Sequence, residues 1–149
     1  MKAKYGLRAL VALGRDYPRG HVLIADLAAS ETIPRKFLEL ILLDLKRKGI
    51  LRSKKGKGGG YDLSRPPSEI SLGEVIRALD GPIALLPCAS ETAYRRCDEC
   101  VDERTCGIRL VIKDVRDATA GILEGTSLQD ILNRSRQAAD APHPAMYHI

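Results

Sequence analysis

Apolar residues in the first third of the chain recur at the spacing of a single helix face. This pattern predicts a helix over residues 2–15, a short one over roughly 23–29, and a longer one from Pro34 to about Lys48. Proline suits the first turn of the third helix, where its missing N–H costs no hydrogen bond. The apolar stripe of that helix, which we expect to be buried, consists of Phe37, Leu38, Ile41, Leu42 and Leu45.

Two short strand-like runs follow the third predicted helix, on either side of a turn rich in glycine and lysine. This arrangement over residues 50–63 predicts a β-hairpin. Three helices followed by a hairpin is the element order of a winged helix-turn-helix domain. Pro66 and Pro67 end this module, so the first domain is predicted to span residues 1–67.

A second region, which contains all four cysteines, is predicted over residues 68–133. Ser71 and Glu74 have the spacing of a capping box that opens a helix ending at Asp80. Residues 83–106 show no periodic pattern, and we expect them to be irregular.

A long amphipathic helix is predicted over about residues 107–124. Its apolar face consists of Ile108, Val111, Ile112, Val115, Ala118 and Ile122. At about 1.5 Å per residue the helix is roughly 25 Å long, and the chain offers few other surfaces to cover that face. We therefore expect two copies of the chain to pair through this helix as a homodimer.

The chain is expected to end in a short helix and a tail. Thr126 and Gln129 are predicted to cap the helix, which runs from Ser127 to about Asn133. Residues 134–149 are expected to be disordered. These elements together predict a mainly α fold with a small β-hairpin, in which a winged helix-turn-helix domain precedes a long dimerisation helix.

Composition and charge narrow the class of protein. Hydrophobic residues make up 44% of the 149 residues, enough for a core, and no run is long and apolar enough for a membrane span. The first residues do not resemble a signal peptide, so we expect a soluble, cytoplasmic protein. Residues 1–67 hold 15 basic and 6 acidic residues, a formal charge of +9, whereas residues 68–149 hold 9 and 13, a charge of −4. A basic front half indicates either a polyanion-binding module or a solvated surface.

The helix-turn-helix pattern favours double-stranded DNA as that polyanion. Such a domain places its second helix in the major groove, with residues near the helix N-terminus facing the base edges. The candidate DNA-binding residues on the helix and the hairpin are Arg35, Lys36, Glu39, Lys54, Lys55, Lys57, Gly58, Gly59 and Tyr61. The glycine-rich turn lacks the Gly-Lys-Ser/Thr ending of a P-loop, and no helix follows it, which argues against a nucleotide site.

Four cysteines, Cys88, Cys97, Cys100 and Cys106, lie within 19 residues. In a cytoplasmic protein such a cluster favours a metal site or a redox sensor over structural disulfides. Four thiolates complete the ligand set of either zinc or an iron–sulfur cluster, and the spacing alone does not choose between them. A metal-free thiol switch is a further alternative.

Several stretches of the chain resemble the Rrf2 family of transcription regulators, in its IscR-like iron–sulfur branch. They are KAKYGLRAL at 2–10, IADLA at 24–28, IPRKFLE at 33–39, GKGGGY at 56–61, SLGEVI at 71–76, and the cysteine loop that leads into a long helix. The resemblance covers roughly residues 2–133. It implies a homodimer with crossing long helices, a roughly palindromic operator, and an iron–sulfur cluster of the 2Fe-2S or 4Fe-4S type. Members sense cluster supply, iron, nitric oxide or redox state, and some relatives lack a cluster and respond to cysteine metabolism.

The resemblance also implies roles for particular residues. The three cysteine ligands of the family fall on Cys88, Cys100 and Cys106, the DNA-reading glutamate falls on Glu39, and the basic contact of the wing falls on Lys55. This chain departs from the pattern at three places. Arg109 stands at the position of a histidine ligand, Lys4 stands where some relatives have a carboxylate ligand, and Cys97 is an additional thiol. Because arginine does not ligate iron, Cys97 is the expected fourth ligand.

An enzyme is the least favoured alternative. The sequence contains no nucleophile–base pair and no dinucleotide-binding fingerprint. Of its three histidines, His21 falls in a predicted loop, and His143 and His148 fall in the predicted tail. The sequence therefore predicts a DNA-binding regulator controlled by an iron–sulfur cluster, with structural zinc or a thiol switch as the alternative.

Overall fold

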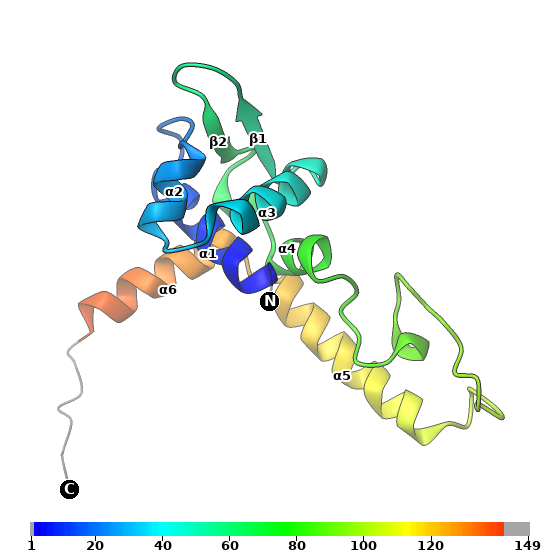
Figure 1. Cartoon of the computed structure of the whole chain (residues 1–149). Coiled ribbons are helices and arrows are strands. Elements are labelled where there is room, and N and C mark those ends of the chain that lie inside the picture. Colours follow the sequence, from blue (N-terminus) through cyan, green and yellow to red (C-terminus); the bar gives the residue numbers. More distant parts are fainter. Residues whose placement is uncertain (1, 142–149) are drawn as a thin grey trace, which may run out of the picture.

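A computed structural model describes residues 2–141 of the chain. The described residues form α1 (Lys2–Arg15), α2 (Ile24–Ser30), α3 (Arg35–Arg47), β1 (Leu51–Lys54), β2 (Gly60–Leu63), α4 (Leu72–Leu79), α5 (Gly107–Glu124) and α6 (Leu128–Asp140). Short 3-10 turns occur at Pro67–Glu69 and Pro87–Ala89. The element order confirms the predicted mainly α fold with a single hairpin (Figure 1).

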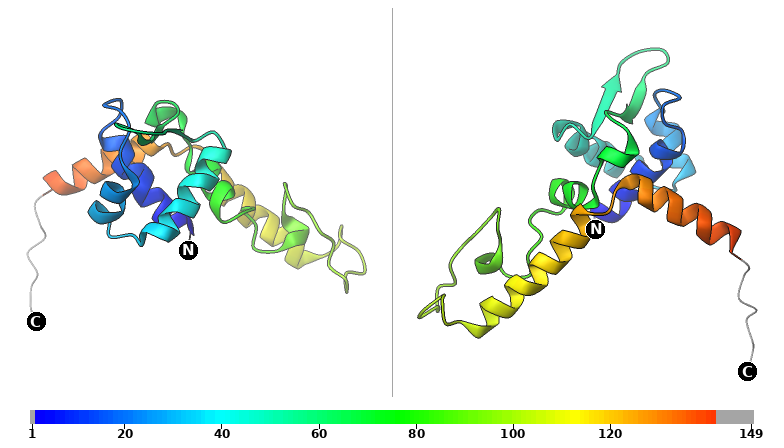
Figure 2. Two further views of the ribbon diagram at one scale, coloured as in Figure 1. Left: turned by 45° about the horizontal axis from the view of Figure 1, so that its top comes forward. Right: turned by 180° about the vertical axis from the view of Figure 1, so that it is seen from behind.

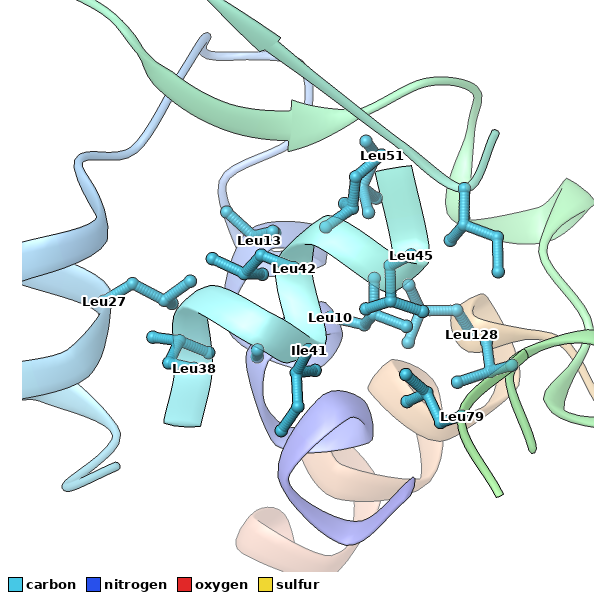
Figure 3. Close-up of a cluster of buried hydrophobic side chains, with 14 of the residues drawn as sticks. Leu10, Leu13, Leu27, Leu38, Ile41, Leu42, Leu45, Leu51, Leu79 and Leu128 are labelled. Carbon is cyan, nitrogen blue, oxygen red and sulfur yellow. The ribbon is translucent and has the colours of Figure 1, made fainter. Parts of the chain in front are cut away.

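The helices α1–α4 and the β1–β2 hairpin, or wing, form a unit that we call the reading head. A leucine-rich core holds this unit together. The predicted stripe of α3 is confirmed, since Leu38, Ile41, Leu42 and Leu45 are fully buried and Phe37 packs at the edge. Figure 3 shows this stripe lying among leucines contributed by α1, α2, β1, α4 and α6. The labelled leucines beyond the stripe are Leu10, Leu13, Leu27, Leu51, Leu79 and Leu128.

The same core continues past residue 67. Ile70, Val75, Leu79 and Leu128 all belong to the single buried cluster, because α4 packs on both α1 and α3. The reading head therefore includes α4, and residues 68–80 do not begin a separate core.

The last three helices set the overall shape. The helix α5 extends from the head and has the cysteine-containing loop at its far end, while α6 packs against α1 and leaves the head on the other side (Figures 1 and 2). Gly14 lies at this contact, where a Cβ would be 3.1 Å from Leu132 Cδ1 and close to Leu128. No helix within residues 2–141 has the length and apolar content needed to cross a membrane.

The C-terminal helix is longer than the sequence pattern indicated. It continues to Asp140, so residues 134–140 are helical rather than part of a disordered tail. The predicted caps Thr126 and Gln129 are also wrong, because Ser127 and Asp130 form the capping box. This box fixes the start of the helix, and the helix-favouring residues beyond position 133 extend it. The rest of the predicted tail, residues 142–149, lies outside the described residues.

The predicted capping box at α4 is only half formed. The Ser71 hydroxyl accepts a hydrogen bond from the Glu74 N–H at 3.1 Å, as expected. The Glu74 carboxylate instead accepts from a single guanidinium nitrogen of Arg65, Nη2, which lies 2.5 Å from both carboxylate oxygens. Because Arg65 also donates to the Gly49 carbonyl at 3.1 Å, it links the end of α3 to α4.

Candidate functional site

The predicted reading residues of α3 lie on its solvent-facing side. A tight turn after α2, closed by the Ile33 N–H donating to the Ala28 carbonyl at 2.9 Å, aims the helix outward. Its apolar stripe is held in the core, so Arg35, Lys36 and Glu39 are all exposed. Arg35 Nε lies 3.2 Å from Glu39 Oε1, which pairs two of the three predicted reading residues with each other.

The wing presents lysine side chains beyond the two strands. β1 and β2 pair antiparallel, with Leu51 opposite Leu63 and Lys54 opposite Gly60. Both leucines face the core, whereas the lysines at the tip, Lys54, Lys55 and Lys57, are exposed. The wing therefore presents three exposed positive charges on a hairpin that projects from the helices (Figure 1).

The glycines of the wing have different local environments. Gly58 is exposed and has a φ of +72°, with open space around it. Gly59 is buried, and a Cβ there would lie 2.3 Å from the Lys54 carbonyl oxygen. Gly60, with a φ of +131°, would place a Cβ 2.2 Å from the Val22 carbonyl oxygen. The turn itself thus requires Gly59 and Gly60, and of the two predicted glycine contacts only Gly58 faces solvent.

Tyr61, another predicted DNA contact, lies at the root of the wing. Its backbone pairs with Val22 through hydrogen bonds of 2.8 and 2.9 Å, and its half-buried side chain packs against the core. The adjacent Asp62 is buried and accepts a hydrogen bond from Arg52 at 2.8 Å. The hydrogen bond and the charge of Asp62 raise the pKa of Arg52 further. These contacts hold the wing against the helical core and give Tyr61 a structural role.

The four cysteines lie on three pieces of one loop. Cys88 lies in the 3-10 turn, Cys106 is the N-cap of α5, and Cys97 and Cys100 flank a turn in which the Cys100 N–H donates to the Cys97 carbonyl at 3.2 Å. All four are free thiols. Cys97 is exposed, whereas the other three are partly buried. Within residues 2–141, no three His, Cys, Asp or Glu side chains are placed together as a metal site.

Two arginines of α5 fasten the start of this loop to the helix. Arg109 Nε donates to the Cys88 carbonyl at 2.9 Å, and Arg116 donates to the Ala89 carbonyl at 2.7 Å. The arginines are seven residues apart, which is two helical turns, so they project from one side of α5. Sequence reasoning treated Arg109 only as a missing histidine ligand and did not identify Arg116. The seven-residue spacing of Arg109 and Arg116 is the feature of the sequence that could have identified this pair.

Cys88 and Cys97 line the same open pocket of about 210 Å³, next to Arg95 and Arg96. The Glu99 N–H lowers the pKa of the Cys97 thiol, but the hydrogen bond to the Glu99 carboxylate and the loss of water around the thiol outweigh it, so the net pKa is raised. Glu99 Oε2 lies 3.5 Å from Cys97 Sγ.

The donor set fits an iron–sulfur cluster or zinc in kind and number. Four thiols are present, two of them on fixed backbone at Cys88 and Cys106, and residues 91–99 between them are exposed throughout. The two remaining thiols belong to that exposed stretch and the turn that ends it.

The apolar face of α5 is uncovered within the described chain. No residue of this helix is buried, and its exposed large apolar side chains are Ile108, Leu110, Val111, Val115 and Ile122. An 18-residue helix in water does not usually keep such a face uncovered.

The chain is similar in sequence and in structure to known transcription regulators. The Rrf2 family model, described as an iron-dependent transcriptional regulator, matches residues 1–134. An rrf2-like HTH-type transcriptional regulator of Rhodobacter capsulatus is 41% identical over 142 residues, covering 93% of this chain and 94% of that protein. The HTH-type transcriptional regulator IscR of Escherichia coli O1:K1 / APEC is 27% identical over 132 residues, covering 89% and 78%. The structure of CymR, the global cysteine regulator of B. subtilis, matches with a TM-score of 0.73 at 26% identity, covering 90% of this chain and 95% of that one.

Proposed function

Because the chain belongs to the Rrf2 family of transcription regulators, we propose that it binds operator DNA as a homodimer under the control of an iron–sulfur cluster. The family consists of DNA-binding regulators and not of enzymes. The observation that carries the proposal is the position of the four-thiol loop. It is fastened to the same helix whose apolar face is uncovered, at the end of a basic winged head.

The DNA-binding part of the proposal rests on the charged outer surface of the head. Lys36 and Glu39 on α3 and Lys54, Lys55 and Lys57 on the wing are all exposed. In this arrangement α3 enters the major groove, Glu39 accepts from a cytosine amino group, and the wing lysines contact phosphates. Gly58 allows the wing backbone to approach the DNA closely.

The homodimer rests on the uncovered face of α5. Pairing two such helices would cover Ile108, Val111, Val115 and Ile122, each of which is more than a third exposed in the single chain. Two heads related by a twofold axis require two half-sites, so the operator is roughly palindromic. Sedimentation of the purified protein tests this point, since a monomer at micromolar concentration would contradict it.

The proposed cluster ligands are Cys88, Cys100 and Cys106, with Cys97 as the fourth. The description of the family as iron-dependent and the similarity to IscR support a cluster over zinc. When bound, an iron–sulfur cluster supplies a redox-active and destructible group that reports cluster supply, iron, nitric oxide or redox state. The chain itself positions one of these ligands, because Arg109 and Arg116 hold the Cys88 turn on α5.

A physical connection leads from the loop to the reading head through α4. Arg77 of α4 pairs with Glu124 at the end of α5 at 2.8 Å, and α4 also packs on α1 and α3. Arg65 then joins Glu74 of α4 to the Gly49 carbonyl behind α3. A change in the loop that shifts α5 would therefore alter the position of α3 by biasing one arrangement over another.

Metal-free thiol control is a second candidate, favoured by one observation. The described residues do not bring three thiols together, while Cys88 and Cys97 already line one pocket. The structural match to CymR, a global cysteine regulator, supports this candidate. A structural zinc site on the same thiols is the other alternative to an iron–sulfur cluster.

Anaerobic purification followed by visible absorption and iron, sulfide and zinc analysis separates these candidates. A brown protein with iron and sulfide supports the cluster. Colourless protein that stays free of iron after attempted reconstitution overturns it, and one zinc per subunit supports the structural alternative. Cys97→Ala should destabilise the cluster, and an unchanged spectrum would reject Cys97 as a ligand.

A further inference from the structure

Two leucines lie on the outer face of the recognition helix, where a core function is excluded. Leu40 is 56% exposed and Leu43 is 37% exposed, although every leucine of the α3 stripe is fully buried. The two are three residues apart, so they are neighbours on one side of the helix. The DNA-binding residues of α3 considered so far, Arg35, Lys36 and Glu39, do not account for them.

The charges around these leucines indicate what they meet. Lys36 lies four residues before Leu40, and Arg47 lies four residues after Leu43, so all four residues share one stripe of α3. Both flanking cations are exposed. The stripe therefore has a small apolar centre with a positive charge on each side, which complements a groove lined by phosphates.

The size of the apolar centre argues against a protein partner. Protein interfaces bury about 800 Å² on each side and contain a larger apolar core, whereas two leucine side chains on a convex helix supply a small fraction of this. The major groove of DNA has one apolar group of matching size, the C5 methyl of thymine, and it occurs there and not in the minor groove.

We propose that Leu40, with Leu43 beside it, reads a thymine methyl group in the major groove of each half-site. This inference rests on the proposed function in so far as α3 is the reading helix, and it deepens that function by assigning a base. Glu39 and Leu40 are adjacent, so a cytosine contact and a thymine contact would fall on nearby base pairs. Lys36 and Arg47 would contact the phosphates on either side.

The test uses a duplex selected from a random pool by the wild-type protein. Each thymine of one half-site is replaced in turn by deoxyuridine, which removes the C5 methyl and leaves the hydrogen-bonding edge unchanged. We expect one or two of these replacements to weaken wild-type binding about three- to fivefold, which is the effect of exposing one methyl group. Leu40→Ala should bind the thymine duplex more weakly by a similar factor and should not distinguish thymine from uracil.

Lys55→Ala is the matched control, since it removes a wing charge and leaves the outer face of α3 intact. It should bind more weakly and keep the full preference for thymine over uracil. Uracil replacements without effect on the wild type would overturn the inference alone, as would a Leu40→Ala variant that still prefers thymine. A pool from which no sequence is enriched would overturn the DNA-reading function itself and the inference with it.

Discussion

Replacing Arg116 with alanine should release the start of the cysteine loop from α5 while the reading head stays folded. Arg116 is 14% exposed and donates to the carbonyl of Ala89, a residue that is 1% exposed, at 2.7 Å. Alanine would leave this acceptor without its donor. Hydrogen bonds to charged groups contribute about 1.5–3 kcal/mol, so opening of the turn should become roughly 10- to 100-fold more frequent.

Hydrogen exchange read by mass spectrometry measures this opening directly. The amides to follow are those of Ser90 and Arg95, which donate to the Pro87 carbonyl at 3.1 and 3.2 Å. Their protection should fall in Arg116→Ala, while peptides from α1 and α3 should be unchanged. Arg136→Ala removes an exposed positive charge from α6 and should leave the loop as protected as in the wild type. Unchanged protection of the loop in Arg116→Ala, or equal loss throughout the head, would refute this role of Arg116.

Further expected results concern the wing and the last helix. Lys55→Ala should lower the salt dependence of DNA binding by about one contact per head, measured as the slope of log K against log salt concentration; an unaltered slope would argue against a phosphate contact. Gly60→Ala should lower the free energy of unfolding by more than about 1–3 kcal/mol, the cost of a left-handed backbone at a non-glycine residue, since its Cβ would also meet a backbone carbonyl. Gly56→Ala has open space for a Cβ, so thermal melts should show a smaller loss of stability for this variant. The pKa of Asp130 is lowered by the hydrogen bonds from its N-cap serine, so the stability it contributes is present above 3.8, the usual aspartate pKa, and is lost as the pH falls through the lowered value. Asp130→Asn should therefore flatten the acid side of the stability curve, and parallel curves would contradict this.

The local parts of the fold could be predicted from the sequence because each depends on neighbouring residues. The buried stripe of α3 follows from apolar residues at helical spacing, and the hairpin follows from glycines with positive φ at its turn. The bounds of α5, Gly107–Glu124, agree with the prediction because Cys106 and Gly125 flank a continuous amphipathic pattern. Local pattern also explains the error at α6, since polar residues after position 133 resemble a tail although they favour helix.

The parts of the site that involve distant residues could not be predicted in the same way. The contacts of Arg109 and Arg116 with carbonyls 21 and 27 residues earlier depend on how an irregular loop returns to α5. Periodicity contains no information about such a return. The burial of Gly59 likewise depends on the close approach of Lys54 across the turn, which composition alone does not reveal.

Control of DNA binding by the cysteine loop is the central claim, and one pair of dissociation constants tests it most directly. An anaerobic preparation that contains iron and sulfide is divided, the cluster is removed from one half, and both halves are titrated with the selected duplex at the same salt concentration. We predict that the two constants differ by about tenfold or more, which corresponds to a coupling of at least about 1.4 kcal/mol. Equal constants for the loaded and the cluster-free protein would contradict the claim.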